Sequence, residues 1–117
     1  MRGTTLSALA LLIAVSSVTM RADERSDARA QVDFGIEVAQ RGLWKEAIYR
    51  WERAIELDPT YAAAWNNLAI SFERAGRPVE ALEAYENALD LEPNNLTIEQ
   101  NYDLFLEVND SVSQDSR

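Results

Sequence analysis

The sequence predicts an all-α protein: an α-solenoid of two helix–turn–helix units, followed by one capping helix and preceded by a signal peptide. Three observations lead to this fold class. The chain repeats itself with a period of 34 residues, so that 28–61 align with 62–95 without a gap. Apolar residues within each unit recur at helical spacing. Glycine and proline interrupt that spacing at matching places in both units.

The residues that are identical in the two units are small, apolar, acidic or turn-forming. Small residues that recur in phase matter because paired helices approach closely only where their side chains are short. The identical pairs are Ala28/Ala62, Ala30/Ala64, Ile36/Ile70, Gly42/Gly76, Glu46/Glu80, Ala47/Ala81, Glu52/Glu86, Ala54/Ala88, Leu57/Leu91 and Pro59/Pro93.

Residues 1–22 have the layout of a secretory signal peptide, with an arginine near the start, an apolar run and a small, polar flank. The apolar run from Leu6 to Val18 covers about 20 Å as a helix, short of the roughly 30 Å hydrocarbon core of a bilayer. We therefore expect an exported chain, periplasmic or secreted, that is cleaved after Ala22 or near Ser17. An uncleaved, membrane-anchored form is the alternative, and 23–27 are expected to form a polar linker.

The second unit, 62–95, shows how each repeat is built. Its first helix ends at Gly76, where a left-handed residue is expected, and Pro78 suits the first turn of its second helix. Pro93 ends that second helix. The apolar stripes of the two helices comprise Trp65, Leu68, Ala69 and Phe72, then Ala81, Leu82, Tyr85, Ala88 and Leu89.

The first unit, 28–61, repeats this plan with breaks at Gly42 and Pro59. Its stripes comprise Phe34, Gly35 and Val38, then Ala47, Ile48, Trp51, Ala54 and Ile55. We expect every aromatic residue of these stripes to pack in the core.

A lone helix is expected after the second unit. Asn94 and Asn95 supply a turn and a helix N-cap, and the helix runs over 96–108 before the polar tail, 109–117. Its apolar residues Tyr102, Phe105 and Leu106 cover the last repeat, and its acidic residues Glu99, Asp103 and Glu107 face water.

The repeated unit resembles the tetratricopeptide repeat (TPR), whose pattern places Trp, Leu-Gly, Tyr, Ala, Phe, Ala and Pro at fixed offsets. The first unit departs from that pattern with Gln31 and Val38 at the Trp and Tyr positions, and otherwise follows it. Matching residues are Trp65, Leu68, Ala69, Phe72, Ala81, Tyr85, Ala88 and Pro93 in the second unit, and Phe34, Gly35, Ala47, Trp51, Ala54 and Pro59 in the first.

The resemblance implies a non-enzymatic adaptor or scaffold that binds a peptide or helix of another protein in a concave groove, lined by the first helix of each repeat. Asn67 stands where the family often has an asparagine, and its amide could clamp a peptide backbone; hydrogen bonds to neighbouring helices are the alternative role for Asn66 and Asn67. The implied groove residues are Arg29, Val32, Asp33, Ile36, Gln40, Asn66, Asn67, Ile70, Arg74, Gln100, Asn101 and Leu104.

Composition argues against catalysis and against several kinds of ligand. The chain has no histidine and no cysteine, so it offers no imidazole base, no thiolate nucleophile and no disulfide, and we expect no cofactor and no metal. A net charge of −9 argues against nucleic acid. Because no basic residue lies between Pro78 and Ser116, the facing surface of a partner protein is expected to be neutral or basic.

Charge pairing is expected to differ between the repeats. Glu46 can pair with Arg50 one helical turn on, whereas Glu80 is followed by Ala84, so the acids of the second repeat are expected to be free and solvated. These acids are Glu80, Glu83, Glu86 and Asp90.

A different class of function also fits the sequence. It is a self-assembling or membrane-tethered envelope protein without a dedicated peptide groove, because two repeats and a cap lie near the lower limit for a stable stack and pairing would add buried surface. The glycosylation patterns at Asn95 and Asn109 matter only if the source glycosylates exported proteins.

Overall fold

The structure is a computed structural model that describes residues 4–110, with side chains described from Ala22 onward. Over these residues the chain is all-α, as predicted. The helices are α1 (Thr4–Gln40), α2 (Trp44–Leu57), α3 (Ala62–Arg74), α4 (Pro78–Leu91) and α5 (Leu96–Val108).

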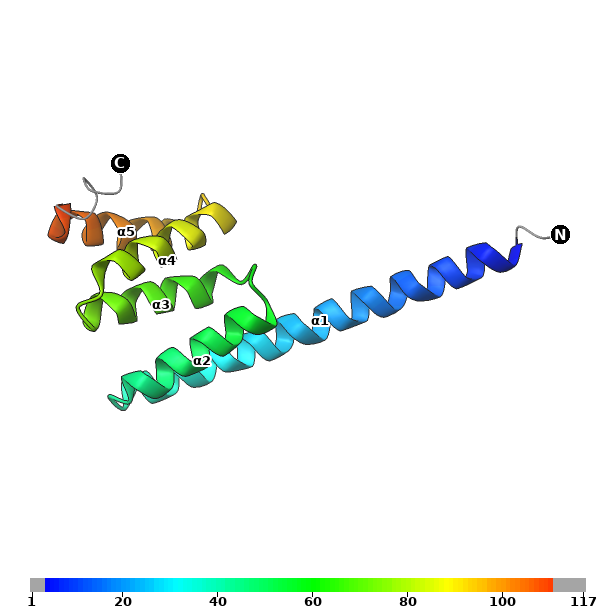
Figure 1. Cartoon of the computed structure of the whole chain (residues 1–117), viewed down its shortest axis with the longest axis horizontal. Coiled ribbons are helices and arrows are strands. Elements are labelled where there is room, and N and C mark those ends of the chain that lie inside the picture. The colour runs from blue at the N-terminus through cyan, green and yellow to red at the C-terminus, as the bar shows by residue number, and fades with distance from the viewer. Residues whose placement is uncertain (1–3, 111–117) are drawn as a thin grey trace.

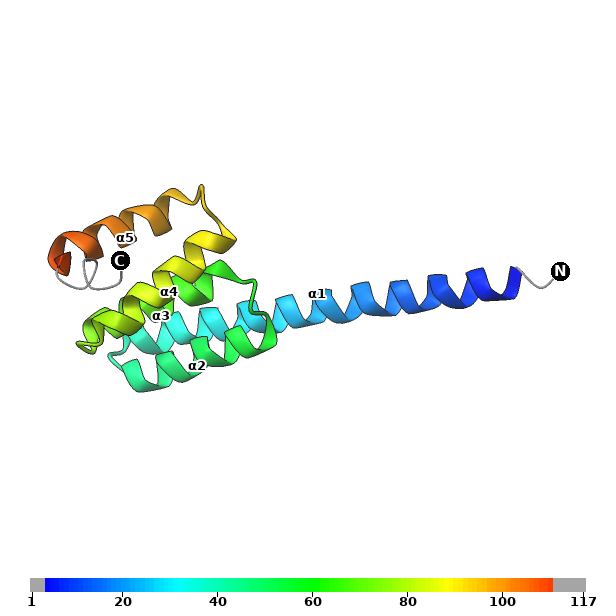
Figure 2. The same cartoon turned by 45° about the horizontal axis from the view of Figure 1, so that its top comes forward.

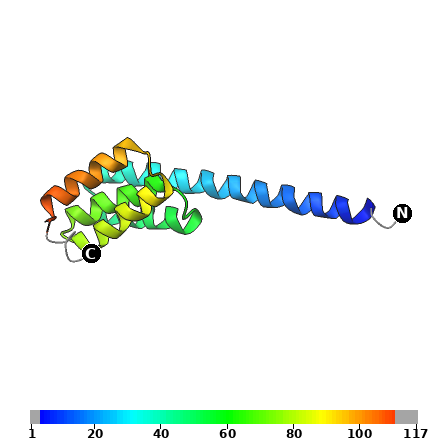
Figure 3. The ribbon, with the colours of Figure 1, turned by 90° about the horizontal axis from the view of Figure 1, so that it is seen from above.

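The helices form a stack of two antiparallel pairs and a cap. The C-terminal half of α1 packs along α2, α3 packs along α4, and α5 lies on the second pair, as predicted for a capping helix (Figures 1 and 2). The N-terminal half of α1 extends away from the other helices in every view (Figure 3).

Residues 23–27 are helical, not the linker that the sequence predicts. No glycine or proline separates them from the first repeat, so the helix of that repeat continues through them as part of α1. The predicted signal peptide, 1–22, falls almost wholly outside the described side chains and stays a prediction, as does the tail beyond Asp110. Among the described helices none is long and apolar enough to cross a membrane.

Arg25 fixes this part of α1 to the loop between the repeats. Its guanidinium pairs with the Asp58 carboxylate, and its Nη2 donates to Thr60 Oγ1 at 3.0 Å. Burial raises the pKa of Asp58, but hydrogen bonds from Thr60 and Arg25 together outweigh that effect, so the pKa lies below its usual value. Helix α1 is therefore held at the boundary between the two repeats.

The predicted helix ends are confirmed. Gly42 and Gly76 have φ of +80° and +70°, the left-handed conformation that ends a helix without strain only at glycine. The amide of Leu43 donates to the carbonyl of Val38 at 3.0 Å, which closes the first of these turns. At the start of α5, the Asn95 side chain accepts hydrogen bonds from the amides of Thr97 and Ile98, as an N-cap does.

Small residues bring the helices of each pair together. The alanines at four repeated positions are completely buried, and they line the contacts within and between pairs. Gly35 is the extreme case, because a Cβ added to it would lie 2.8 Å from Cδ1 of Trp51. The buried alanines are Ala28, Ala47, Ala54, Ala62, Ala81 and Ala88, with Ala69 at the position that Gly35 occupies in the first repeat.

Two buried aromatic residues fix the core. Trp51 Nε1 donates to the carbonyl of Val32 at 3.2 Å, and Tyr85 donates its hydroxyl to the Glu73 carboxylate. Burial, and then the bond to Glu73, raise the pKa of Tyr85 above its usual range. Both side chains thus satisfy their polar atoms inside the stack.

One aromatic residue departs from the predicted core. Phe34 is 41% exposed, and its outer ring face is covered by the Arg50 guanidinium, 4.6 Å from the ring centroid. Among the described residues no other repeat covers this position of the first repeat, and an arginine of its own second helix covers it instead.

The close contact between Gly35 and Trp51 makes a testable prediction. Gly35→Ala is expected to lower the free energy of unfolding by about 1–3 kcal/mol, since the added methyl group overpacks the indole. Urea denaturation followed by circular dichroism measures this loss. In a Trp51→Phe background the smaller ring leaves room for the methyl group, and the loss from Gly35→Ala should shrink; an equal loss in both backgrounds would contradict the contact.

Candidate protein-binding groove

One hollow lies on the predicted groove face, between the two repeats. It has a volume of about 310 Å³ and is formed by α1, α2 and α3. Four of the residues predicted to line the groove meet here, two from each repeat, and all but Gln40 and Asn67 of the lining are apolar. The lining, which we call the groove hollow, comprises Ile36, Ala39, Gln40, Trp44, Trp51, Asn67 and Ile70.

Asn67 presents an amide at this hollow. Its backbone carbonyl accepts a hydrogen bond from the Ser71 hydroxyl at 2.7 Å, but its side-chain amide has no partner among the described residues. A half-exposed amide can donate and accept at once, which matches the two hydrogen-bonding groups of a peptide backbone. The side-chain amide of Asn67 is therefore available to hydrogen-bond the backbone of a bound peptide.

Arg74 borders the hollow. Its guanidinium lies over the Trp44 ring, 4.3 Å from the centroid, while the residue as a whole is exposed. The indole face attracts the cation, so the stacking holds one positive charge beside the apolar lining. Trp44 and Trp51 lie on α2, the second helix of the first repeat. The sequence prediction took groove residues only from the first helix of each repeat, so it did not place these two tryptophans at the groove.

Two predicted groove residues are buried, not exposed in the groove. Val32 is 2% exposed and packs in the core, and Asn66 accepts a hydrogen bond from Asn101 Nδ2 at 3.2 Å. Asn66 thus has the alternative role, a bond to a neighbouring helix. Gln100 occupies the matching position of α5 and is exposed. Val32, Asn66 and Gln100 thus occupy one repeated position. It is buried on α1 and α3 and exposed on α5, as expected if each unit is covered by the next.

The other predicted residues lie at the surface. Leu104 is 62% exposed on α5, and with Ile36 and Ile70 it occupies one repeated position on α1, α3 and α5. Arg29 and Asp33 are exposed on α1, beyond the lining of the groove hollow. The structure therefore collects Ile36, Gln40, Asn67 and Ile70 at one place and spreads the rest over the same helices.

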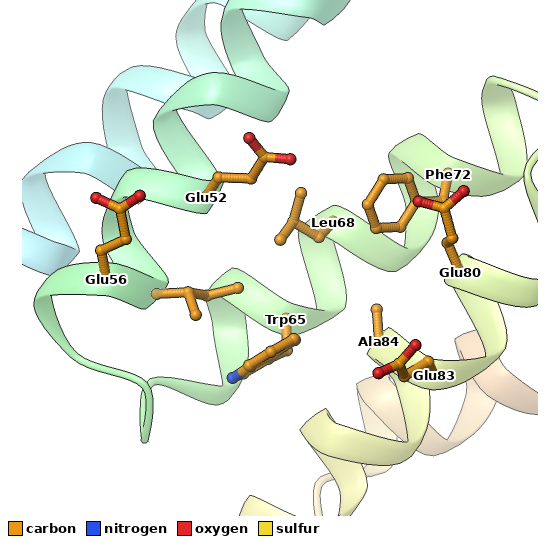
Figure 4. A pocket seen from close by; sticks show the side chains of 9 residues that line it. Glu52, Glu56, Trp65, Leu68, Phe72, Glu80, Glu83 and Ala84 are labelled. Carbon is orange, nitrogen blue, oxygen red and sulfur yellow. The ribbon is translucent and has the colours of Figure 1, made fainter.

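A second hollow, of about 410 Å³, lies between α2, α3 and α4 (Figure 4). Its floor is apolar, and four glutamates stand around it, with Glu52 and Glu56 on one side and Glu80 and Glu83 on the other. The lining, which we call the acidic hollow, comprises Glu52, Ile55, Glu56, Trp65, Leu68, Phe72, Glu80, Glu83 and Ala84.

The ion pairs of the first repeat are confirmed, and those of the second correct the sequence prediction. Arg50 pairs with Glu46 at 2.9 Å, as expected. Glu80 is not free, because it pairs with Arg77, three residues before it. The bond to Glu80, with the nearby charge of Glu52, raises the pKa of Arg77. The sequence prediction considered only a basic residue four residues after each glutamate, so it missed the pair of Glu80 with Arg77, which lies three residues before it.

The other acids of α4 are solvated, as predicted: Glu83, Glu86 and Asp90 are exposed. Within the described part of the chain, no group of acidic side chains is arranged to hold a metal ion.

Family models match both repeats. The model described as "Tetratricopeptide repeat" matches residues 62–95, and the one described as "TPR repeat" matches 37–76. The chain belongs to the tetratricopeptide repeat family. Repeats of this family generally mediate binding to other proteins and are generally not catalytic.

Three curated relatives show the same resemblance. The chain is 32% identical over 73 residues (62% of this chain, 24% of the relative) to tetratricopeptide repeat domain-containing protein PYG7, chloroplastic, of Arabidopsis thaliana. It is 39% identical over 54 residues (46% of this chain, 16% of the relative) to small glutamine-rich tetratricopeptide repeat-containing protein 2 of Saccharomyces cerevisiae. It is 35% identical over 83 residues (70% and 33%) to type IV pilus assembly protein PilF of Pseudomonas aeruginosa. The chain spans at most a third of the length of each.

Proposed function

We propose that this protein is an exported, non-catalytic adaptor that binds an extended or helical segment of another protein in the groove formed by α1, α3 and α5. One observation carries the proposal: Ile36, Gln40, Asn67 and Ile70, from two different repeats, line one hollow. A site shared between repeats exists only when the stack is folded, as a dedicated binding site requires.

The chemistry of the groove hollow suits a peptide. An apolar side chain of the partner would enter between Ile36 and Ile70, where burial of its surface supplies most of the binding free energy. Beside it, the free amide of Asn67 would hydrogen-bond the partner's backbone and fix its direction. The exposed Leu104 extends the apolar row to α5, so a partner segment of several residues could contact all three helices.

The N-terminal sequence supports the exported location. Residues 1–22 combine an early arginine, an apolar run too short to span a bilayer as a helix, and small residues near the proposed cleavage sites. Tethering by an uncleaved N-terminus is the competing outcome.

Binding in the groove can be tested with a photo-crosslinking amino acid placed at Gln40 in the full chain, expressed in cells of its source. Gln40 lines the groove hollow and is exposed, so crosslinks to another protein are expected from this position while the Asn67 amide is kept. Ile36→Glu should lower their yield by at least about tenfold, because a carboxylate in an apolar contact is costly to desolvate. Mass spectrometry of the crosslinked product identifies the partner.

The matched control places the crosslinker at Val79, which is 68% exposed on α4 and does not line the groove hollow. The melting temperature of the Ile36→Glu variant should equal that of the original chain within a few degrees, since Ile36 is an exposed residue. Crosslinks from Val79 and none from Gln40, or an unchanged yield with Ile36→Glu, would place the binding site elsewhere.

Export has its own test. The mass of the chain recovered from its source is expected to correspond to a product that begins at Asp23, or a few residues earlier if cleavage occurs near Ser17. Recovery of the full-length mass from the membrane fraction would contradict cleavage and support a tether, without bearing on the groove.

A further inference from the structure

The acidic hollow lies on the side of α3 that faces away from the groove hollow. On α3, Trp65 and Leu68 line the acidic hollow, while Asn67 and Ile70 line the groove hollow. With 3.6 residues per turn, these two stripes point in nearly opposite directions. A ligand in one hollow therefore leaves the other open.

Charge around the acidic hollow is only partly balanced. Arg53 pairs with Glu56, and Arg77 pairs with Glu80. Glu52 and Glu83 form no ion pair within the described residues. Four carboxylates and two cations leave a local excess of negative charge above an apolar floor.

The first repeat shows how an arginine side chain binds an aromatic ring beside a carboxylate. There the side chain of Arg50 crosses the equivalent surface: it bonds Glu46 at 2.9 Å, approaches Gln31 Oε1 at 3.4 Å and covers the Phe34 ring. A guanidinium combines a planar face for the ring with donors for the carboxylate, so it satisfies both parts of the surface.

In the second repeat Arg77 makes contacts of the same kind, because its guanidinium pairs with Glu80 and lies 4.7 Å from the centroid of the Phe72 ring. Within the described residues, no ion pair or cation–π contact reaches Trp65, Glu52 or Glu83. A shift of 34 residues replaces Arg50 by Ala84 and Gln31 by Trp65, whereas the carboxylate of Glu46 is kept as Glu80. Trp65, Glu80 and Ala84 all line the acidic hollow. Ala84 is 2% exposed and contributes only its methyl group to the lining of the hollow (Figure 4).

We propose that the acidic hollow binds an arginine-bearing segment of a partner protein, whose guanidinium makes at Trp65 the kind of contact that Arg50 makes at Phe34. The aliphatic part of the arginine and a neighbouring apolar side chain pack on Trp65 and Leu68. The guanidinium lies against the Trp65 ring and donates to Glu83 and Glu52, which have no ion pair of their own. This site is separate from the groove and does not depend on the proposed groove function.

The three indole N–H groups of the chain report on the two hollows separately. Trp65 lines the acidic hollow, while Trp44 and Trp51 line the groove hollow. The probe is a blocked helical peptide with arginine and leucine on one face, and its matched control carries citrulline, a neutral analogue, in place of arginine. Two-dimensional ¹H–¹⁵N NMR of the full chain follows the three indole signals during each titration.

The arginine peptide should shift the Trp65 signal saturably and leave the Trp44 and Trp51 signals in place. The citrulline peptide should bind at least about tenfold more weakly, because it lacks the charge that the carboxylates recognise. No saturable shift of Trp65, shifts confined to Trp44 and Trp51, or equal affinity for both peptides would overturn the proposal.

A variant of the protein supplies the second arm. Glu52→Gln combined with Glu83→Gln removes the two carboxylates that bind the guanidinium, and it should lower the affinity for the arginine peptide at least about tenfold without loss of helicity, because both side chains are exposed. Glu86→Gln combined with Asp90→Asn removes the same charge from exposed positions of α4 outside the lining, and this control should bind nearly as the original chain does. If both variants bind the arginine peptide equally well, the hollow is not the site.

Discussion

The close approach of paired helices at small residues is the contact on which the rest of the structure depends. Gly35 lets Trp51 lie directly against α1, and buried alanines do the same at the repeated positions of every pair. Dispersion and apolar burial are strongest where backbones come this close. Because the chain has no cysteine, no disulfide supports these contacts, and packing together with a few hydrogen bonds and ion pairs holds the stack together.

The same packing decides which surfaces remain for binding. Each first helix has one stripe that faces its own partner helix and another that faces the groove, and the stripes do not overlap. Residues at the boundary between repeats are buried in the stack, as Val32 and Asn66 show, and so cannot contact a partner. What is left on one side is the groove hollow with the free amide of Asn67, and on the other side the acidic hollow beside Ala84. A small molecule of two repeats thus presents two chemically different surfaces.

Much of the fold could be predicted because its signals are local. The left-handed glycines, Gly42 and Gly76, and the N-cap Asn95 each act within one turn of the chain, and the period of 34 residues revealed the pairing of helices. The groove was harder to predict, since the role of Asn66 depends on a hydrogen bond from Asn101, which lies on α5, 35 residues along the sequence. The ion pair of Arg77 was missed for another reason. Arg77 precedes the first residue of α4 and pairs with Glu80 three residues later, whereas the sequence prediction considered only a basic residue four residues after each glutamate.

The small-residue contacts join the four helices from α1 to α4 into one cooperative unit, to which α5 is added as a cap. Native-state hydrogen exchange of the chain measures this most directly, since it gives an opening free energy for each helix. The slowest amides of α2, α3 and α4 should share one opening free energy, equal to that of global unfolding, and those of α5 should open at a lower value. Separate opening of the first helix pair, well below the second, would contradict the claim.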